Sequence, residues 1–118
     1  MKYGSLFAGI GGFDLGFERA GWECAWQVEK NLFCLSVLRR HWPDVPKFED
    51  VIACGSRNLS TVDAIIGGDP CQENANCRRS AETKSPSLGG EFIRIIDEIR
   101  PRIVVRENPA AVRADAPW

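Results

Sequence analysis

The sequence predicts an α/β protein with a mostly parallel sheet that carries helices on both of its faces. Two observations lead to this class. Segments with the character of strands alternate with segments of helical periodicity, and turns that contain glycine or proline separate them. Because ligands of such sheets bind beyond the carboxyl ends of the strands, we expect the functional residues to follow the strands directly.

The first predicted strand–helix unit spans residues 2–21. Residues 2–7 are expected to form a strand that runs into a glycine-rich turn at residues 8–12. A helix follows this turn, and Gly21 supplies its stop. The residues that share one face of this helix, at spacings of four and three, are Phe13, Phe17 and Ala20.

The second unit begins with a predicted strand at residues 22–28. Asn31 is expected to cap the helix that follows, and Pro43 ends that helix. The apolar residues that recur three and four apart along it are Leu35, Leu38 and Trp42. Residues 44–61 are less regular, and the sequence predicts only a short strand there, near Phe48.

The second half of the chain contains two further predicted strands and one helix. Residues 62–66 are predicted to form a buried strand that the pair Gly67–Gly68 closes, and residues 72–86 to form a long exposed loop. A helix is expected from Ser87 onward. The strand that follows this helix is predicted at residues 103–106. The apolar face of the helix is formed by Phe92, Ile95, Ile96 and Ile99.

Length and composition fit one domain of an intracellular protein. The 118 residues leave room for one core, and 44% apolar with 26% charged residues is typical of globular proteins. No apolar run approaches the roughly 20 residues that span a bilayer, and no signal-peptide pattern is present. We therefore expect a cytoplasmic location without a membrane partner. The five cysteines form no C-x-x-C pair, which with a single histidine predicts reduced thiols and no metal site.

The turn at residues 8–12 and the acids that follow it indicate an adenosine-containing ligand. Glycines there let a ligand approach the backbone closely, although a simple strand-to-helix connection has the same pattern. A dinucleotide fingerprint needs a third glycine where Asp14 stands, and a carboxylate would repel pyrophosphate but tolerate the cationic S-adenosylmethionine. Glu29 follows the second strand, where an acid can accept hydrogen bonds from ribose hydroxyls; a solvated charge is equally consistent. Asp50 could accept a hydrogen bond from an adenine amino group.

Cys71 is the candidate nucleophile, because it follows the predicted buried strand directly. The pair Gly67–Gly68 allows an abrupt turn, and Pro70 fixes its own backbone angle. A nucleophilic thiol must be rigidly aimed and partly exposed, and a turn at the end of a strand meets both needs. An ordinary loop cysteine is the alternative, which the setting between Pro70 and Gln72 disfavours.

The ordered motifs of the chain resemble the successive signature motifs of cytosine-5 DNA methyltransferases. These motifs are Phe7-Ala8-Gly9-Ile10-Gly11-Gly12, Glu29, Asp50, Asp69-Pro70-Cys71-Gln72 and Glu107-Asn108. Residues 85–92 also resemble a stretch of the bacterial and phage members, and the resemblance extends over essentially the whole chain up to Asn108. It implies a Rossmann-like, S-adenosylmethionine-dependent methyltransferase fold.

The resemblance also implies a mechanism for a DNA (cytosine-5-)-methyltransferase. The thiolate of Cys71 would add to carbon 6 of a cytosine, so that carbon 5 becomes nucleophilic enough to take a methyl group. Glu107 would hydrogen-bond ring nitrogen 3 and the exocyclic amine, and Asn108 would hold the cysteine loop in place. The partner would be double-stranded DNA with the target cytosine flipped out, which suggests a nucleoid-associated, restriction-modification type of enzyme.

The cofactor implied by the resemblance is S-adenosylmethionine, with S-adenosylhomocysteine as its product. Its expected site is formed by Phe7, Gly9, Gly11, Glu29 and Asp50. The sequence departs from the family pattern at two positions. Lys30 stands where a bulky apolar residue often stacks on the adenine, and Pro109 stands where valine or another apolar residue is common.

The same resemblance predicts that residues 1–118 are the N-terminal portion of a truncated catalytic domain. The target-recognition region and the C-terminal motifs of the family are absent, which accounts for a net charge of −1 in a protein expected to act on DNA. The isolated chain is therefore expected to be marginally stable and inactive, with an exposed apolar edge at residues 103–106. Three other interpretations are one half of a split enzyme with a complementing C-terminal polypeptide, a non-catalytic S-adenosylmethionine-binding remnant and, disfavoured by Asp14, a dinucleotide oxidoreductase.

Overall fold

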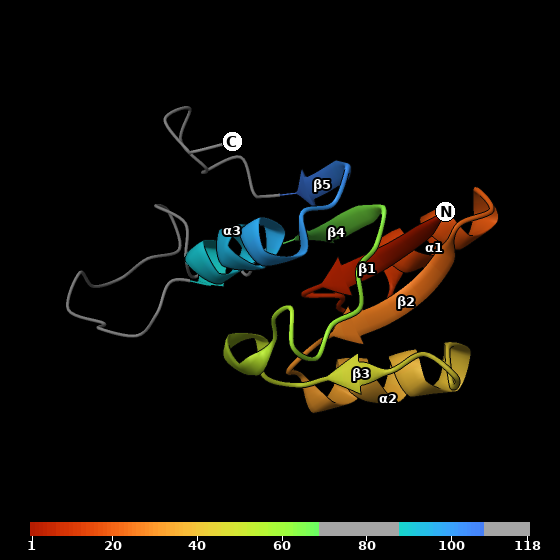
Figure 1. The fold of residues 1–118 in the computed structure, drawn as a ribbon. Coiled ribbons are helices and arrows are strands. Elements are labelled where there is room, and N and C mark those ends of the chain that lie inside the picture. Colours follow the sequence, from red (N-terminus) through yellow and green to blue (C-terminus); the bar gives the residue numbers. More distant parts are fainter. Residues whose placement is uncertain (69–87, 108–118) are drawn as a thin grey trace.

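The computed structural model describes residues 1–68 and 88–107, and these residues build one parallel sheet with helices (Figure 1). The strands are β1 (Lys2–Leu6), β2 (Glu23–Val28), β3 (Lys47–Phe48), β4 (Ala64–Gly68) and β5 (Ile103–Glu107). The helices are α1 (Gly12–Arg19), α2 (Leu32–His41), the short 3-10 helix η1 (Val51–Ala53) and α3 (Leu88–Ile99).

The order of the strands places a crevice next to β1. The sheet runs β3-β2-β1-β4-β5, and every neighbouring pair is parallel. The chain moves outward from β1 through β2 to β3 and then returns to the other side of β1 to form β4. Connections therefore leave β1 and β4 toward opposite faces, and the carboxyl ends of these two strands are where ligands of doubly wound sheets bind.

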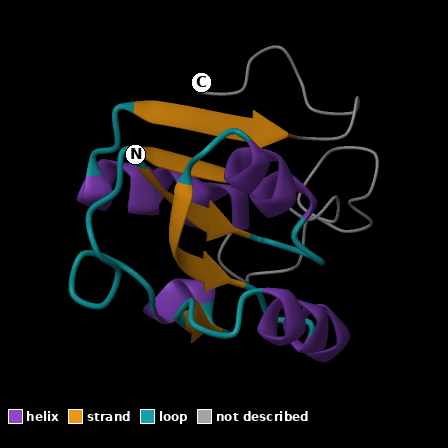
Figure 2. Cartoon of the chain, turned by 90° about the vertical axis from the view of Figure 1, so that its right-hand side faces the viewer, coloured by secondary structure: helices purple, strands orange, loops and turns teal. Residues whose placement is uncertain are grey.

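Helices lie on both faces of the sheet (Figures 1 and 2). Two apolar cores, one on each face, hold them to it. The larger core joins the sheet to α3 and η1, and its fully buried members include Trp26, Ile65 and Phe92. The smaller core lies on the α1 face and is built around Tyr3 and Ile66. The helices thus cover both faces of the sheet, as the alternation of strands and helices predicted.

Helix α2 begins and ends where the sequence predicted. The side chain of Asn31 accepts a hydrogen bond from the backbone amide of Cys34 at 3.0 Å, which satisfies one of the free amides of the first turn. Helix α1 has no such side-chain cap. It begins after Gly11, whose φ of 92° lies in the left-handed region that glycine adopts at little cost.

The fourth strand differs from its prediction by two residues. It was expected at residues 62–66 with Gly67–Gly68 as its stop, but both glycines lie within β4. A Cβ atom on Gly67 would lie 2.2 Å from the carbonyl oxygen of Leu6 and 3.0 Å from the ring of Phe92. The glycine is therefore needed for close packing inside the strand.

The remaining elements are close to their predictions, with one addition. The strands predicted at residues 2–7, 22–28 and 103–106 and near Phe48 are confirmed, and the helix expected from Ser87 is described from Leu88 onward. Helix η1 was not predicted. The loop expected at residues 72–86 lies outside the described residues.

Strand β5 is the edge strand of the described sheet, and its apolar side chains are only partly covered. Ile103 and Val104 are 41% and 42% exposed. No helix in the described ranges is long and apolar enough to cross a membrane. Over the same residues, no group of acidic, histidine and cysteine side chains is arranged to hold a metal ion.

Candidate functional site

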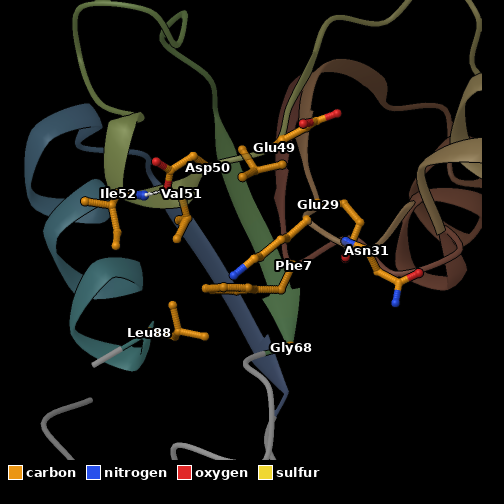
Figure 3. Close-up of a pocket in the computed structure, with 11 residues that line it drawn as sticks. Phe7, Glu29, Asn31, Glu49, Asp50, Val51, Ile52, Gly68 and Leu88 are labelled. Carbon is orange, nitrogen blue, oxygen red and sulfur yellow. Dashed lines mark hydrogen bonds between the residues drawn. The ribbon is translucent and has the colours of Figure 1, made fainter. Parts of the chain in front are cut away.

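An open pocket of about 1040 Å³ lies at the carboxyl ends of β1, β2 and β4 (Figure 3). Its walls come from segments that are far apart in the sequence. Its lining includes Phe7, Glu29, Asp50, Ile52, Gly68 and Leu88. The pocket thus occupies the crevice that the strand order predicts.

Glu29 ties the end of β2 to the glycine turn after β1. Its Oε1 accepts a hydrogen bond from the backbone amide of Gly9 at 2.8 Å, and its Oε2 accepts one from the amide of Asn31 at 2.7 Å. Each carboxylate oxygen can accept a second hydrogen bond. The side chain is half-buried at the pocket wall, so a ligand with hydroxyl donors can use this remaining capacity.

Phe7 lies in the pocket in a backbone conformation that is unusual for its residue type. Its φ is 52°, in the left-handed region that costs a non-glycine residue about 1–3 kcal/mol. Its ring stacks on that of Phe92, with centroids 6.3 Å apart and an interplanar angle of 15°. The core around Phe92 therefore orients one face of Phe7, which lines the pocket.

Asp50 contributes a second acidic wall. One of its carboxylate oxygens, Oδ1, accepts a hydrogen bond from the amide of Ile52 at 3.0 Å and so caps η1. Within the described residues, Oδ2 has no hydrogen-bond partner. The neighbouring Glu49 also lines the pocket and forms an exposed ion pair with Arg39 at 3.6 Å.

Glu107 reaches the same edge of the sheet from β5. It is the last residue of that strand and pairs in register with Gly68, which lines the pocket. A Cβ atom on Gly68 would lie 3.0 Å from Oε2 of Glu107, so the carboxylate lies directly against this glycine. Two further predicted site residues, Cys71 and Asn108, lie outside the described residues.

The two glycines that the sequence predicted for the site have different surroundings. Gly9 has a φ of 59° and donates its amide hydrogen to Glu29 at the pocket wall. Neither Gly9 nor Gly11 is among the residues that line the pocket. A Cβ atom on Gly11 would lie 2.5 Å from the ring of Trp42, so this glycine lets α1 start against α2.

Asp14 does not face the pocket, which overturns the argument that its charge acts on a ligand. Its side chain is fully buried in a cluster of polar groups on the α1 face. Ser5 Oγ donates to one carboxylate oxygen at 3.0 Å, and Gln27 Nε2 donates to the other at 2.9 Å. Burial raises the pKa of this carboxyl, and the hydrogen bonds from Gln27 and Ser5 oppose the shift.

The charges that can act on a ligand are those of the residues that line the pocket. Among the described residues, the lining includes the carboxylates of Glu29, Glu49 and Asp50 and one ammonium group, that of Lys30. An excess of carboxylates disfavours a phosphate-bearing ligand and favours one that offers hydroxyl or amino donors or a positive charge. Glu49, Ile52, Leu88 and Asn31 were not predicted as part of the site. They flank predicted residues or open a predicted helix, and only this adjacency could have indicated them.

Comparison with known proteins gives one consistent family. Residues 1–115 match the family model described as C-5 cytosine-specific DNA methylase. The type II methyltransferase M.AquIA of Picosynechococcus is 35% identical over an alignment of 115 positions, which covers 88% of this chain and 46% of M.AquIA. The type II methyltransferase M.FnuDI of Fusobacterium nucleatum is 38% identical over an alignment of 112 positions, which covers 92% of this chain and 32% of that protein.

A solved structure gives the same result for the fold. A prophage-encoded protein of E. coli, assigned as a DNA modification methyltransferase, superposes with a TM-score of 0.80 and 26% identity. The match covers 98% of this chain and 34% of that protein. The Rossmann-like methyltransferase fold is therefore confirmed, and the chain spans less than half the length of the curated relatives that it matches.

Proposed function

The chain belongs to the C-5 cytosine-specific DNA methylase family, and we propose that it forms the methyl-donor site and part of the catalytic site of a DNA (cytosine-5-)-methyltransferase. The observation that carries this proposal is the convergence of Phe7, Glu29 and Asp50 on one pocket at the carboxyl ends of the strands. These residues come from three separate motifs, and only the fold brings them together.

We propose that the pocket binds S-adenosylmethionine and its product S-adenosylhomocysteine. Glu29 accepts hydrogen bonds from the two ribose hydroxyls with the lone pairs that Gly9 and Asn31 leave open. Asp50 accepts one from the adenine amino group through its second oxygen. Phe7 packs on the adenine ring, and the excess of carboxylates suits the cationic sulfonium and ammonium groups.

Lys30 takes a place in the pocket lining where related enzymes often have a bulky apolar residue. The butyl stem of a lysine can cover an aromatic face while its ammonium group stays in water. We propose that Lys30 covers one face of the adenine in this way. The positive charge also offsets part of the repulsion among the carboxylates of Glu29, Glu49 and Asp50.

The proposed reaction uses Cys71 as the nucleophile. Its thiolate adds to carbon 6 of the flipped cytosine, and Glu107 stabilises the charge that develops on the ring through hydrogen bonds to nitrogen 3 and the exocyclic amine. Bound S-adenosylmethionine supplies the methyl group that carbon 5 takes up. Loss of the carbon 5 proton to water then expels the Cys71 thiol. The position of Glu107 against Gly68, three residues before Cys71, supports this assignment.

Double-stranded DNA is the proposed substrate, and its recognition requires more protein than this chain. The chain covers 46% of M.AquIA and 32% of M.FnuDI, and its net charge is −1. Proteins that bind DNA gain much of their affinity from basic side chains against phosphates. We therefore propose that methyl transfer needs the remaining part of the domain, in the same polypeptide or in a complementing one.

Calorimetric titration of the chain with S-adenosylhomocysteine and with NAD tests the cofactor assignment. Saturable binding of S-adenosylhomocysteine without binding of NAD is the expected result, because NAD brings pyrophosphate to a pocket with three carboxylates. Binding of NAD without binding of S-adenosylhomocysteine would instead support an oxidoreductase and would contradict the proposed function.

A further inference from the structure

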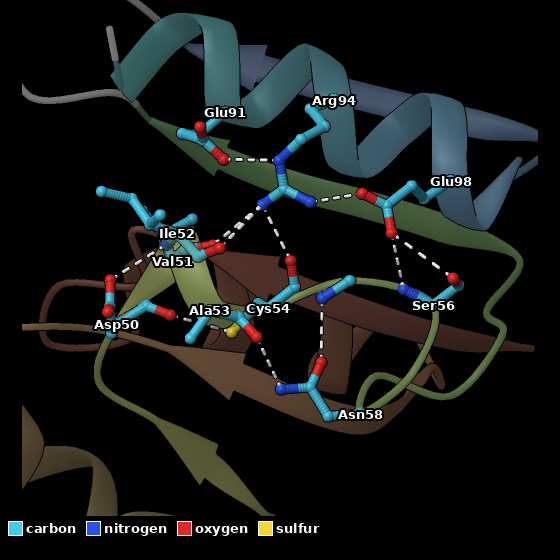
Figure 4. A network of polar contacts seen from close by, with 11 residues as sticks. Asp50, Val51, Ile52, Ala53, Cys54, Ser56, Asn58, Glu91, Arg94 and Glu98 are labelled. Carbon is cyan, nitrogen blue, oxygen red and sulfur yellow. Dashed lines mark hydrogen bonds and ion pairs between the residues drawn. The ribbon is translucent and has the colours of Figure 1, made fainter. Parts of the chain in front are cut away.

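Arg94 joins helix α3 to the segment that forms the acidic wall of the pocket (Figure 4). Its Nε donates to Glu91 at 2.6 Å, and its Nη1 donates to Glu98. Its Nη2 donates to the carbonyl oxygens of Val51 at 3.1 Å and Cys54 at 2.8 Å. One guanidinium group thus satisfies two acids on its own helix and two carbonyls from a segment about 40 residues earlier.

The geometry of these contacts is specific to arginine. Glu91 and Glu98 flank Arg94 on the same face of α3, at spacings of three and four residues, and fix the plane of the guanidinium group. With this plane fixed, Nη2 is directed at η1. A lysine has one nitrogen and no fixed fork, so it cannot serve both acids and both carbonyls at once.

Among the described residues, the other hydrogen bonds of the segment held by Arg94 run within the segment or to the same helix. Asn58 accepts from the amide of Gly55 and donates to the carbonyl of Ala53, which closes the turn internally. Glu98 accepts from the amide of Ser56 at 3.0 Å. Loss of Arg94 should therefore free the turn as a unit rather than unravel it.

This segment is also the pocket wall. Residues 50–52 line the pocket, and Leu88, the first residue of α3, lines it from another side. Val51 and Cys54 are buried in the larger core, so the η1 backbone is fixed against α3 at its apolar contacts as well as at Arg94. Helix α3 therefore supports two parts of the wall.

We propose that Arg94 is a positioning residue, which holds Asp50 where its carboxylate can accept a hydrogen bond from the adenine amino group. This inference rests on the proposed function of the pocket. It assigns to Arg94, which does not line the pocket, control over how the pocket recognises adenine.

The test compares Arg94→Lys with a control directly after the end of the same helix, Arg100→Lys. The side chain of Arg100 is 79% exposed and, in the part of the chain that the structure describes, pairs only with Asp97, one turn earlier, so its replacement removes an arginine without touching the wall. Binding of two ligands to each 118-residue protein is measured by calorimetry. The ligands are S-adenosylhomocysteine and S-inosylhomocysteine, in which a carbonyl oxygen replaces the adenine amino group.

The wild type and Arg100→Lys should both prefer S-adenosylhomocysteine, because S-inosylhomocysteine would place a carbonyl oxygen, an acceptor, against the carboxylate of Asp50. Arg94→Lys should bind S-adenosylhomocysteine roughly tenfold more weakly, the loss expected for one charge-assisted hydrogen bond. It should lose most of the preference between the two ligands. A merely structural loss would weaken both ligands equally. Hydrogen exchange should accelerate at residues 51–56 of Arg94→Lys and stay unchanged in β1 and β4.

The outcomes separate the inference from the proposed function. If Arg94→Lys retains the wild-type affinity and preference, the inference is wrong and the proposed function stands. If the wild type binds neither ligand, both are overturned. Should Arg94→Lys fail to fold, Glu98→Gln provides the second variant, because it keeps an acceptor for Ser56 but removes one ion pair of Arg94. A reduced ligand preference in Glu98→Gln is then expected, and an unaltered one contradicts the inference.

Discussion

The carboxylate of Glu29 accepts the backbone amide of Gly9 at 2.8 Å and so links the ends of β1 and β2, although the two residues are 20 positions apart. The same carboxylate accepts the amide of Asn31, the N-cap residue of α2. One acid therefore fixes the turn after the first strand and the start of the second helix. A ligand that bonds Glu29 meets a side chain that is already oriented, so little of the binding free energy is lost in ordering it.

Replacing Glu29 by glutamine should weaken S-adenosylhomocysteine binding by roughly 10- to 100-fold, the range for loss of charge-assisted hydrogen bonds. The amide nitrogen of the new side chain is a donor, so one of the two backbone amides at Gly9 and Asn31 would face a donor instead of an acceptor. Calorimetric titration measures the affinity. Glu23→Gln is the control, because it makes the same charge change at the exposed start of the same strand. Equal affinities of the two variants would contradict the role given to Glu29.

Replacing Gly67 by alanine should lower the free energy of unfolding by about 1–3 kcal/mol, as overpacking of a core does. The added Cβ would lie 2.2 Å from the carbonyl oxygen of Leu6, and neither strand can move without breaking the β1–β4 pairing. Urea unfolding followed by circular dichroism measures the change. Gly16→Ala is the matched control, because nothing lies within 4 Å of its added Cβ and the helix interior favours alanine by about 0.5–1 kcal/mol. The two variants should therefore shift stability in opposite directions.

The part of the fold that follows from the sequence is the part set by local patterns. Alternating strand and helix character gave the five strands and three α-helices, and Asn31 marked the start of α2. Phe7, Glu29 and Glu107 were assigned to the site mainly through the family resemblance. Their positions at strand ends agree with this prediction, because parallel strands direct their carboxyl ends to one edge. Gly67 was misassigned as a turn residue because its constraint comes from Leu6, on another strand.

The features that escaped prediction depend on contacts between distant segments. Asp14 stands in the first turn of α1 beside the glycine turn. Nothing local shows that Ser5 and Gln27 draw its side chain into a buried polar cluster on the α1 face, away from the pocket. Arg94 looks like any charged residue on an amphipathic helix. Its contacts with Val51 and Cys54 span 43 and 40 residues, so only the folded chain reveals them.

Cys24 and Cys54 should resist alkylation in the folded protein. Burial, with a smaller contribution from Asp14, raises the pKa of Cys24 to about 12, and burial with Asp50 raises that of Cys54 to about 11. The reactive thiolate is therefore scarce at pH 8. Peptide mass spectrometry after brief treatment with iodoacetamide should find both unmodified, and both modified after unfolding in urea. Rapid labelling of either thiol in the folded state would show that its site is open to solvent.

The ion pair and the hydrogen bonds of Glu98 should make stability depend on pH in the acid range. The hydrogen bond from the Ser56 amide, followed by that from Arg94, lowers the pKa of Glu98 in the folded state. A lowered pKa gives stability that is present above the unfolded value, about 4.3, and is lost as pH falls through the folded value. The wild type should therefore exceed Glu98→Gln in melting temperature at pH 6, and this advantage should shrink toward pH 3.

The measured quantity is the difference in melting temperature between the wild type and Glu98→Gln. A difference is needed because Asp14 changes stability with pH in the opposite direction to Glu98. Burial raises the pKa of Asp14, so its contribution to stability falls as pH rises, and it is present in both proteins. Subtraction of the two thermal melting curves removes this common part. An advantage of the wild type that is constant from pH 6 to pH 3 would show that Glu98 does not titrate with the fold.

Cys71 should form a covalent adduct with DNA that contains 5-fluorocytosine once the remaining part of the domain is supplied. Fluorine at carbon 5 cannot leave as a proton does, so the enzyme stays bound to carbon 6 after methyl transfer. Denaturing electrophoresis of duplex mixed with protein and S-adenosylmethionine should show a complex that Cys71→Ala abolishes. Cys54→Ala is the control, because the Cys54 thiol is buried and donates a hydrogen bond to the carbonyl oxygen of Asp50 at 3.3 Å. An adduct that persists in Cys71→Ala would mean that another residue is the nucleophile.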